Sequence, residues 1–298
     1  MIRRLEFALS RYLISVCFFK GNFVIFRAVA GVGLMLCAVG MVFMGPTRAV
    51  ADEPQLTGGP YVPTPQRVVD AMLGIAGVSD RDFVIDLGSG DGRTVIAAAK
   101  RGVRALGLEY NPDMVALSEL EAKKAGVTDK ASFQRADIFV TDFTRATVVT
   151  MYLLPSLNMK LRPQLLDMKP GTRLVSHAFS MGDWEPDESA YSEERKAMLW
   201  IVPAKVGGNW RVQIDQAGVQ PSDASFKQTF QKIEGTMRVA RDNHALFDAR
   251  LRGDEVRFTV LENPSLRRDF VGRVEGDRMF GTVRSTGQGE AKFTATRK

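Results

Sequence analysis

A glycine-rich turn that follows an acidic residue carries the clearest chemical signal in the chain. Residues 84–92 read VIDLGSGDG, with Asp86 two residues before the first of three glycines, and an Ala-rich segment begins at Arg93. Glycine is useful in such a turn because it adopts positive φ and lets a ligand lie against the backbone. The helix that starts after the turn favours an anionic group at its N-terminus, a phosphate or a carboxylate. The pattern therefore predicts a ligand-binding turn between a strand and a helix.

Two further acidic residues follow the next two expected strands. Glu109 ends the second strand, 23 residues after Asp86, where a carboxylate can accept both hydroxyls of a ribose. Asp137 follows the third strand and can accept from an adenine amino group. Ligands of doubly wound sheets bind in the crevice at the C-terminal ends of the strands. The three carboxylates indicate a nucleoside-bearing ligand there, although a strand-end or loop carboxylate can also be merely solvated.

The elements that must position this turn alternate between strand and helix patterns. Thr64 and Pro65 predict a helix start, with the hydroxyl as N-cap and the proline as first helical residue. Further helices are expected from Arg93, Asn111 and Leu157. Such alternation predicts a parallel sheet with helices on both faces, a Rossmann-like α/β fold. The expected strands lie at 83–87, 105–109, 131–136, 147–154 and 172–179, followed by a hairpin of 198–202 and 210–214 that ends the sheet.

The pattern changes to short alternating runs from about residue 222. These runs predict a small all-β antiparallel barrel or sandwich of about six strands, with Gly253-Asp254 and Gly276-Asp277 as turns. We accordingly expect an α/β domain at 60–216 and a β accessory domain at 222–298. The expected strands lie at 227–233, 244–251, 255–261, 268–274, 278–283 and 290–296.

The first 51 residues look like a targeting segment. An uncharged apolar run at 28–47 follows basic residues and precedes Ala49-Val50-Ala51, the order of a secretory signal. The run is also nearly long enough for a membrane anchor. We expect an exported, periplasmic or membrane-anchored protein, with membrane association through 28–47 and a linker at 52–59. A cytoplasmic protein with a downstream start is the alternative.

Charge and cysteine content exclude several kinds of function. The 298-residue chain has 40 Lys and Arg against 34 Asp and Glu, but six of the basic residues and one acidic residue fall in 1–51. The remainder is close to neutral, which argues against nucleic-acid binding. Both cysteines, Cys17 and Cys37, also lie in the leader. We therefore expect no metal site built on cysteine in the body.

The turn and its surroundings resemble class I S-adenosylmethionine (SAM)-dependent methyltransferases. DLGSGDG with a downstream acidic residue is the signature of that class. PYVPTP at 60–65, GLEYNP at 107–112 and WEPD at 184–187 narrow the resemblance over about residues 58–203. These segments are most similar to mitochondrial protein-lysine N-methyltransferases of the ATP synthase c-subunit and adenine nucleotide translocase type, and to their bacterial relatives. The resemblance implies SAM as cofactor, with contacts from Tyr61, Thr64, Asp86, Gly88, Ser89, Gly90, Glu109, Asn111 and Asp137.

The sequence indicates the methyl donor more clearly than the molecule that accepts the methyl group. Tyr152 and Pro155 end the fourth expected strand where the methyl group should lie, so they are the candidate catalytic residues. The Asn/Asp-Pro-Pro-Tyr motif of adenine and glutamine methylation is absent there. The resemblance suggests a protein lysine, and an unidentified small molecule is the alternative acceptor. His177 fits either a core position or a site role. A non-catalytic exported binding or assembly protein with the same fold is the remaining alternative.

Overall fold

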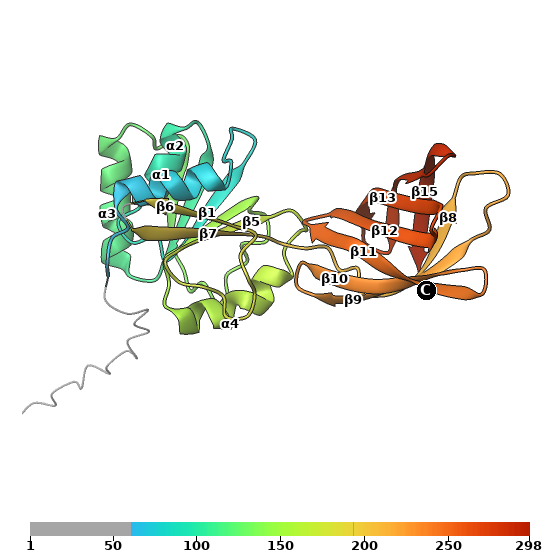
Figure 1. Cartoon of the computed structure of the whole chain (residues 1–298). Coiled ribbons are helices and arrows are strands. Elements are labelled where there is room, and N and C mark those ends of the chain that lie inside the picture. The colour runs from blue at the N-terminus through green and yellow to red at the C-terminus, as the bar shows by residue number, and fades with distance from the viewer. Residues whose placement is uncertain (1–60, 193) are drawn as a thin grey trace, which may run out of the picture. The chain divides into compact units, whose positions relative to one another are not determined.

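The computed structural model describes residues 61–192 and 194–298. The predicted leader at 1–51 and linker at 52–59 lie outside these residues. Within the described residues, four helices cover a mixed sheet, and an antiparallel barrel follows it in the chain (Figure 1). The helices are α1 (Gln66–Ile75), α2 (Arg93–Lys100), α3 (Pro112–Lys124) and α4 (Pro155–Leu166).

The sheet has seven strands in the order β3-β2-β1-β4-β5-β7-β6. The first five strands along the chain are parallel, as predicted, and β7 runs antiparallel to both β5 and β6. The chain runs outward from β1 through β2 to β3 and then crosses back to β4, on the other side of β1, so the strand order switches between β1 and β4. The strands are β1 (Phe83–Leu87), β2 (Arg104–Glu109), β3 (Ala131–Arg135), β4 (Val148–Met151), β5 (Arg173–His177), β6 (Glu188–Ser192) and β7 (Arg195–Ile201).

Both faces of the sheet are buried, as a parallel sheet requires. Successive side chains of β1 alternate, so that Val84 packs in the cluster with α1 and α2 while Ile85 and Leu87 pack in the cluster with α4. Asp86 shares the face of Val84 by the same alternation. The apolar runs of the strands are thus continuous because each face has its own core.

The C-terminal β region is a closed barrel, which decides between the two predicted architectures. Its eight strands close in the order β10-β11-β12-β13-β14-β15-β8-β9, and aromatic side chains, including Trp210, Phe258 and Phe270, fill the interior. The strands are β8 (Gly208–Ile214), β9 (Ser222–Thr229), β10 (Lys232–Val239), β11 (Asp242–Arg252), β12 (Glu255–Asn263), β13 (Leu266–Glu275), β14 (Arg278–Ser285) and β15 (Gly289–Arg297).

The hairpin predicted from 198–202 and 210–214 is wrong. The strand β7 pairs with β5 and β6, whereas β8 pairs with β9 and β15 of the barrel. The turn residues between the two strands are typical of a hairpin, but sequence patterns do not show which sheet edge a strand joins. We propose on this pairing that the domain boundary lies between Ile201 and Gly208, before the predicted division at 216–222.

Two turns of the barrel contain no glycine, and the first of them differs from the prediction. The run predicted as a strand at 227–233 crosses the β9–β10 turn, where Phe230 has φ 54°, and the next turn has Ala240 at φ 53°. Positive φ is uncommon for such residues. Phe230 is held in place because its ring stacks on that of Trp184, with centroids 5.7 Å apart, in the loop that follows β5.

Candidate functional site

The predicted glycine turn lies at the C-terminal end of β1 and adopts the conformation that requires glycine. Gly88, Gly90 and Gly92 have φ values of 72°, 54° and 77°, and α2 begins at the next residue. Neighbouring groups lie close to the turn. A Cβ atom on Gly88 would lie 2.9 Å from Leu153 Cδ2, and one on Gly90 would lie 2.6 Å from Tyr61 Cε2. Larger residues at Gly88 or Gly90 would therefore clash with these side chains.

Asp86 is buried under the glycine turn. Its Oδ1 accepts a hydrogen bond from Thr150 Oγ1 of β4 at 2.6 Å, and the Thr94 hydroxyl of α2 also bonds the carboxyl group. Burial raises the pKa of Asp86 to about 7, although these hydrogen bonds oppose the shift. Asp86 thus links β1, β4 and α2 directly below the turn.

Glu109 lies at the end of β2, beside the same turn. Its Oε2 accepts from the Gly90 N–H and its Oε1 accepts from the Asn111 N–H, both at 2.9 Å. The carboxylate therefore fixes the backbone of the glycine turn as well as presenting oxygens at the predicted ribose position.

Replacing Glu109 with alanine should consequently affect both binding and stability. We expect SAM affinity to fall roughly 10–150-fold, because a charged hydrogen-bond acceptor is lost. We also expect a loss of about 1–3 kcal/mol in the free energy of unfolding, because the Gly90 amide is left without its acceptor. Titration with SAM and thermal melting measure the two effects. Glu119→Ala, on the exposed side of α3, is the matched control, and unchanged SAM affinity in Glu109→Ala would refute the ribose assignment.

The segment before α1 is tied to the glycine turn. Tyr61 lies against Gly90, and Arg93 Nη1 donates to the Thr64 carbonyl at 2.8 Å while its guanidinium pairs with Asp91 at 2.6 Å. The prediction that the Thr64 hydroxyl caps the helix is wrong. The helix α1 begins at Gln66 without a side-chain cap, and Thr64 Oγ1 bonds His177 Nδ1 at 3.1 Å.

Three other predicted cofactor residues differ in the hydrogen bonds that their side chains make. Asn111 Oδ1 accepts from the Asp113 N–H and caps α3, and Asp137 Oδ1 accepts from the Phe139 N–H at 2.8 Å. Both side chains thus shape their own loops. Ser89 Oγ is buried and has no hydrogen-bond partner within the described residues. Its hydroxyl therefore keeps its full hydrogen-bonding capacity.

The candidate catalytic residues lie at the end of β4. Tyr152 follows the strand directly, and Pro155 is the first residue of α4. The Tyr152 ring lies 4.0 Å from that of His177, centroid to centroid, at an angle of 33°. The sequence allows a core or a site role for His177. The fold brings its ring beside Tyr152. Burial and the nearby Arg195 lower the pKa of His177 to about 4, so its imidazole is neutral at pH 7.

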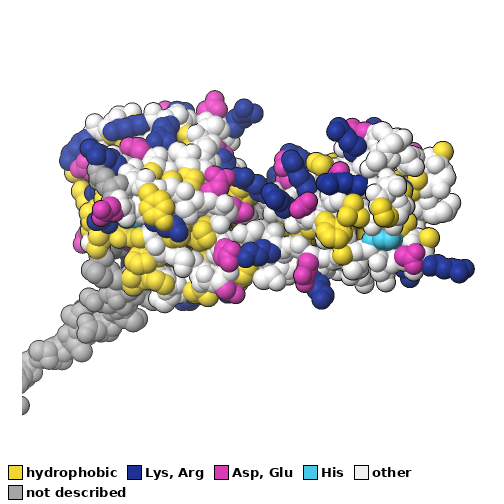
Figure 2. Space-filling model, in the orientation of Figure 1, with side chains coloured by type: hydrophobic (Ala, Val, Ile, Leu, Met, Phe, Trp, Pro, Cys, Tyr) yellow, Lys and Arg dark blue, Asp and Glu magenta, His cyan; other side chains and the backbone are white. Residues whose placement is uncertain are grey.

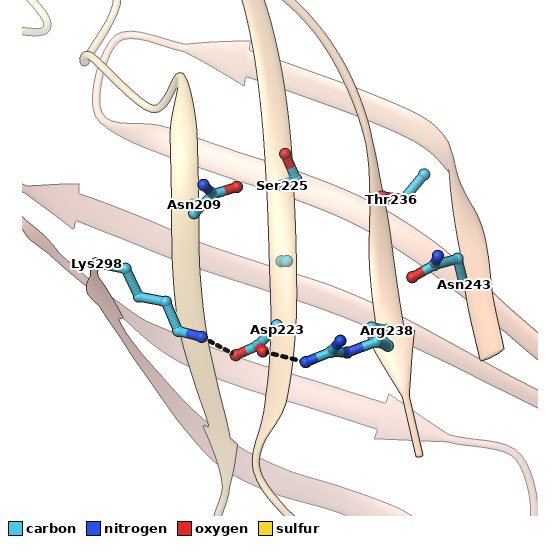
Figure 3. Close-up of a pocket in the computed structure, with 8 residues that line it drawn as sticks. Asn209, Asp223, Ser225, Thr236, Arg238, Asn243 and Lys298 are labelled. Atoms are coloured by element: carbon cyan, nitrogen blue, oxygen red, sulfur yellow. Dashed lines mark hydrogen bonds and ion pairs between the residues drawn. The ribbon is translucent and has the colours of Figure 1, made fainter. Parts of the chain in front are cut away.

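The barrel carries a separate surface pocket of about 260 Å³. Figure 3 shows Asp223 at its edge, paired with Lys298 at 2.6 Å and Arg238 at 2.8 Å. Hydrogen bonds from Lys298 and Arg211 lower the pKa of Asp223 well below its usual range. The pocket includes none of the predicted site residues. Its lining residues are Asn209, Asp223, Ala224, Ser225, Thr236, Arg238, Asn243 and Lys298.

Charged side chains of both signs are mixed on one face of the molecule. Figure 2 shows Lys and Arg interspersed with Asp and Glu on the face in view. No group of three or more His, Cys, Asp or Glu within the described part of the chain could hold a metal ion.

Comparison with known proteins identifies the family. A family model described as the ANTKMT methyltransferase domain matches residues 86–188, which run from Asp86 to the start of β6. A protein-lysine N-methyltransferase of Saccharolobus islandicus is 48% identical over 132 residues, which cover 43% of this chain and 82% of that protein. The chain belongs to this methyltransferase family. It is a SAM-dependent methyltransferase by this membership.

More distant relatives carry narrower names. A Mus musculus lysine N-methyltransferase named for the c-subunit of ATP synthase is 33% identical, over 56% of this chain and 66% of the relative. The adenine nucleotide translocase lysine N-methyltransferase of the same species is 34% identical, over 54% of this chain and 70% of the relative. A solved structure named RNA methyltransferase from Salinibacter ruber, in complex with S-adenosyl-L-homocysteine, is 48% identical at a TM-score of 0.48 and covers 49% of this chain and 96% of that one.

The residues at the end of β1 and β2 fit SAM. The positive-φ glycines form a tight turn that larger residues would not fit, Glu109 presents carboxylate oxygens beside it, and the buried Ser89 hydroxyl has no hydrogen-bond partner within the described residues. These features match a cofactor that carries a ribose and charged groups. When bound, SAM supplies a methyl group on a positively charged sulfur.

Proposed function

We propose that this protein methylates lysine side chains of proteins. The main support is the 48% identity to a protein-lysine N-methyltransferase of which this chain covers 82%. The end of β4 agrees with this proposal, because Tyr152 and the three residues after it replace the Asn/Asp-Pro-Pro-Tyr motif of adenine and glutamine methylation. We also propose that the residues predicted to bind SAM hold the donor beside this end of β4.

The chemistry asks the protein mainly to position the two reactants. The lone pair of the lysine nitrogen attacks the methyl carbon while the carbon–sulfur bond breaks, with its electrons on sulfur, and the methylated nitrogen releases its extra proton to water. Holding the reactants in line supplies much of the rate enhancement. Lysine must lose a proton before it attacks, which a desolvated site favours because burial lowers the pKa of an amine.

Labelling of host material tests the acceptor. Purified protein is incubated with SAM carrying a labelled methyl group and with protein, RNA and small-molecule fractions from the host. We expect label in protein, released as methyl-lysine after hydrolysis. Label confined to RNA or to small molecules would refute the lysine proposal and leave the methyltransferase assignment intact. Gly90→Val, designed below to lose SAM binding, is the control for contaminating activity.

We further propose that the predicted leader directs export. The apolar run at 28–47 lies outside the described residues, and within them no helix is long and apolar enough to cross a bilayer. If the signal is cleaved after Ala51, the mature chain in the native host begins at Asp52. N-terminal sequencing and intact mass check this prediction. A mature chain that begins at Met1 would instead favour the anchor. A mature chain that begins between Met1 and Asp52 would favour a downstream start.

A further inference from the structure

An aromatic cluster lies at the ends of β4 and β5, and none of its residues is among those predicted to contact the cofactor. The cluster consists of Tyr152, His177 and Phe179. The Tyr152 ring lies 4.0 Å from the His177 ring and stacks on the Phe179 ring at 5.7 Å, with an interplanar angle of 13°. Tyr152 therefore lies in contact with both of the other rings.

The cluster lies next to the glycine turn in the sheet. The register pairs Leu87 of β1 with Met151 of β4, and Met151 with Ser176 of β5. Gly88 follows Leu87 and Tyr152 follows Met151, so the turn and the cluster leave adjacent strands at the same edge. Leu153 confirms this proximity through its close approach to Gly88.

The backbone between His177 and Phe179 is strained. Ala178 has φ 61°, and the Phe179 N–H donates to the His177 carbonyl at 2.7 Å, which closes a three-residue γ-turn. The Phe179 carbonyl is held in turn by Ser176 Oγ at 2.7 Å and by Asn158 Nδ2 at 3.3 Å. Strain of this kind persists only where surrounding contacts enforce it, and it concentrates at functional sites. Here it places Phe179 against Tyr152.

Two buried polar atoms around this turn lack hydrogen-bond partners among the described residues: His177 Nε2 and Asn158 Oδ1. Folded proteins leave few such atoms, because each costs about 1–3 kcal/mol. Thr64 Oγ1 engages the other ring nitrogen of His177. If Nδ1 carries the proton and donates it to Thr64, Nε2 keeps a lone pair and is a hydrogen-bond acceptor.

We propose that the aromatic cluster binds the acceptor amine, and that His177 Nε2 accepts a hydrogen bond from its N–H. This inference rests on the proposed lysine acceptor. Aromatic faces attract alkylammonium groups, and they fit the methylated product for the same reason. The hydrogen bond to Nε2 would fix the nitrogen and direct its lone pair. His177 is too weak a base to take the proton of an ammonium group, so its part is to orient the amine.

Nitrogen NMR of the imidazole rings tests the proposal directly. The chain has two histidines, so His244→Gln assigns the spectrum and His244 serves as internal control. The probe is n-butylamine, which copies a lysine side chain, added to the wild-type protein with S-adenosyl-L-homocysteine. We expect the Nε2 resonance of His177 to shift saturably while the His244 resonances stay in place. Amine binding that leaves Nε2 unmoved, or no amine binding, would overturn the proposal.

Variants separate the hydrogen bond from the aromatic contact. Tyr152→Leu should weaken n-butylamine binding to the S-adenosyl-L-homocysteine complex about tenfold. Thr64→Ser should preserve the His177 shift, whereas Thr64→Val should remove it, because only serine retains the hydroxyl. Equal shifts in both Thr64 variants would refute the Nε2 assignment. If host proteins gain methyl-lysine but Nε2 does not respond, this inference fails alone; if no lysine is methylated, the proposed function fails.

Discussion

Gly90→Val is expected to reduce SAM affinity about a hundredfold or more. A Cβ atom at this position would lie 2.6 Å from Tyr61 Cε2, far inside van der Waals contact, and a φ of 54° is strained for a branched residue. Valine would therefore displace Tyr61, distort the turn, or do both. It would also disturb the Gly90 N–H that Glu109 holds. Titration with SAM measures the loss of affinity.

Gly102→Val is the matched control for this substitution. Gly102 also has positive φ, 84°, but an added Cβ would meet nothing within 4 Å. It should lose about 1–2 kcal/mol of stability from backbone strain and keep wild-type SAM affinity. A further test uses Tyr61: in a Gly90→Ala background, Tyr61→Ala should recover part of the lost thermal stability, because it removes the clash. SAM affinity in Gly90→Val equal to that in Gly102→Val would contradict the predicted cofactor turn.

Asp86→Asn is expected to make the protein more stable at pH 8 and to weaken SAM binding. The carboxyl group has a pKa of about 7 in the folded protein, against 3.8 as its ordinary value, because it is buried. The folded state therefore binds the proton more tightly than the unfolded state. This contribution to stability is fully present below about pH 4 and is lost as the pH rises to about 7. The loss amounts to about 4 kcal/mol, which asparagine avoids because it does not titrate.

Denaturant unfolding of both proteins between pH 4 and pH 8 measures this effect. The difference in free energy of unfolding between variant and wild type should grow with pH up to about pH 7 and then level off. All other titrating groups are present in both proteins, so the difference isolates Asp86. A difference that stays constant over this range would show that Asp86 titrates alike in both states. We expect the ionised Asp86 to lower the free energy of unfolding because its charge serves SAM binding.

The sequence alone determined the parallel α/β core and the turn at residues 84–92. These predictions depended on local signals: apolar runs of strand length, helix starts, and glycines placed where a strand meets a helix. The contact between Glu109 and the turn could be anticipated because parallel strands end at the same edge of a sheet. The sequence did not predict that the Gly90 and Asn111 N–H groups donate to Glu109. These hydrogen bonds make Glu109 a structural residue as well.

Only the tertiary structure decided which partners the remaining segments take. Residues 208–214 joined the barrel and not the sheet, because strand pairing is set by long-range contacts that local patterns do not encode. The Phe230 turn was hidden because packing against Trp184, and no glycine, supports its positive φ. Thr64 reads locally as a helix cap, yet its hydroxyl binds His177, 113 residues away. The aromatic cluster beside the glycine turn likewise exists only because β4 and β5 are neighbours in the folded sheet.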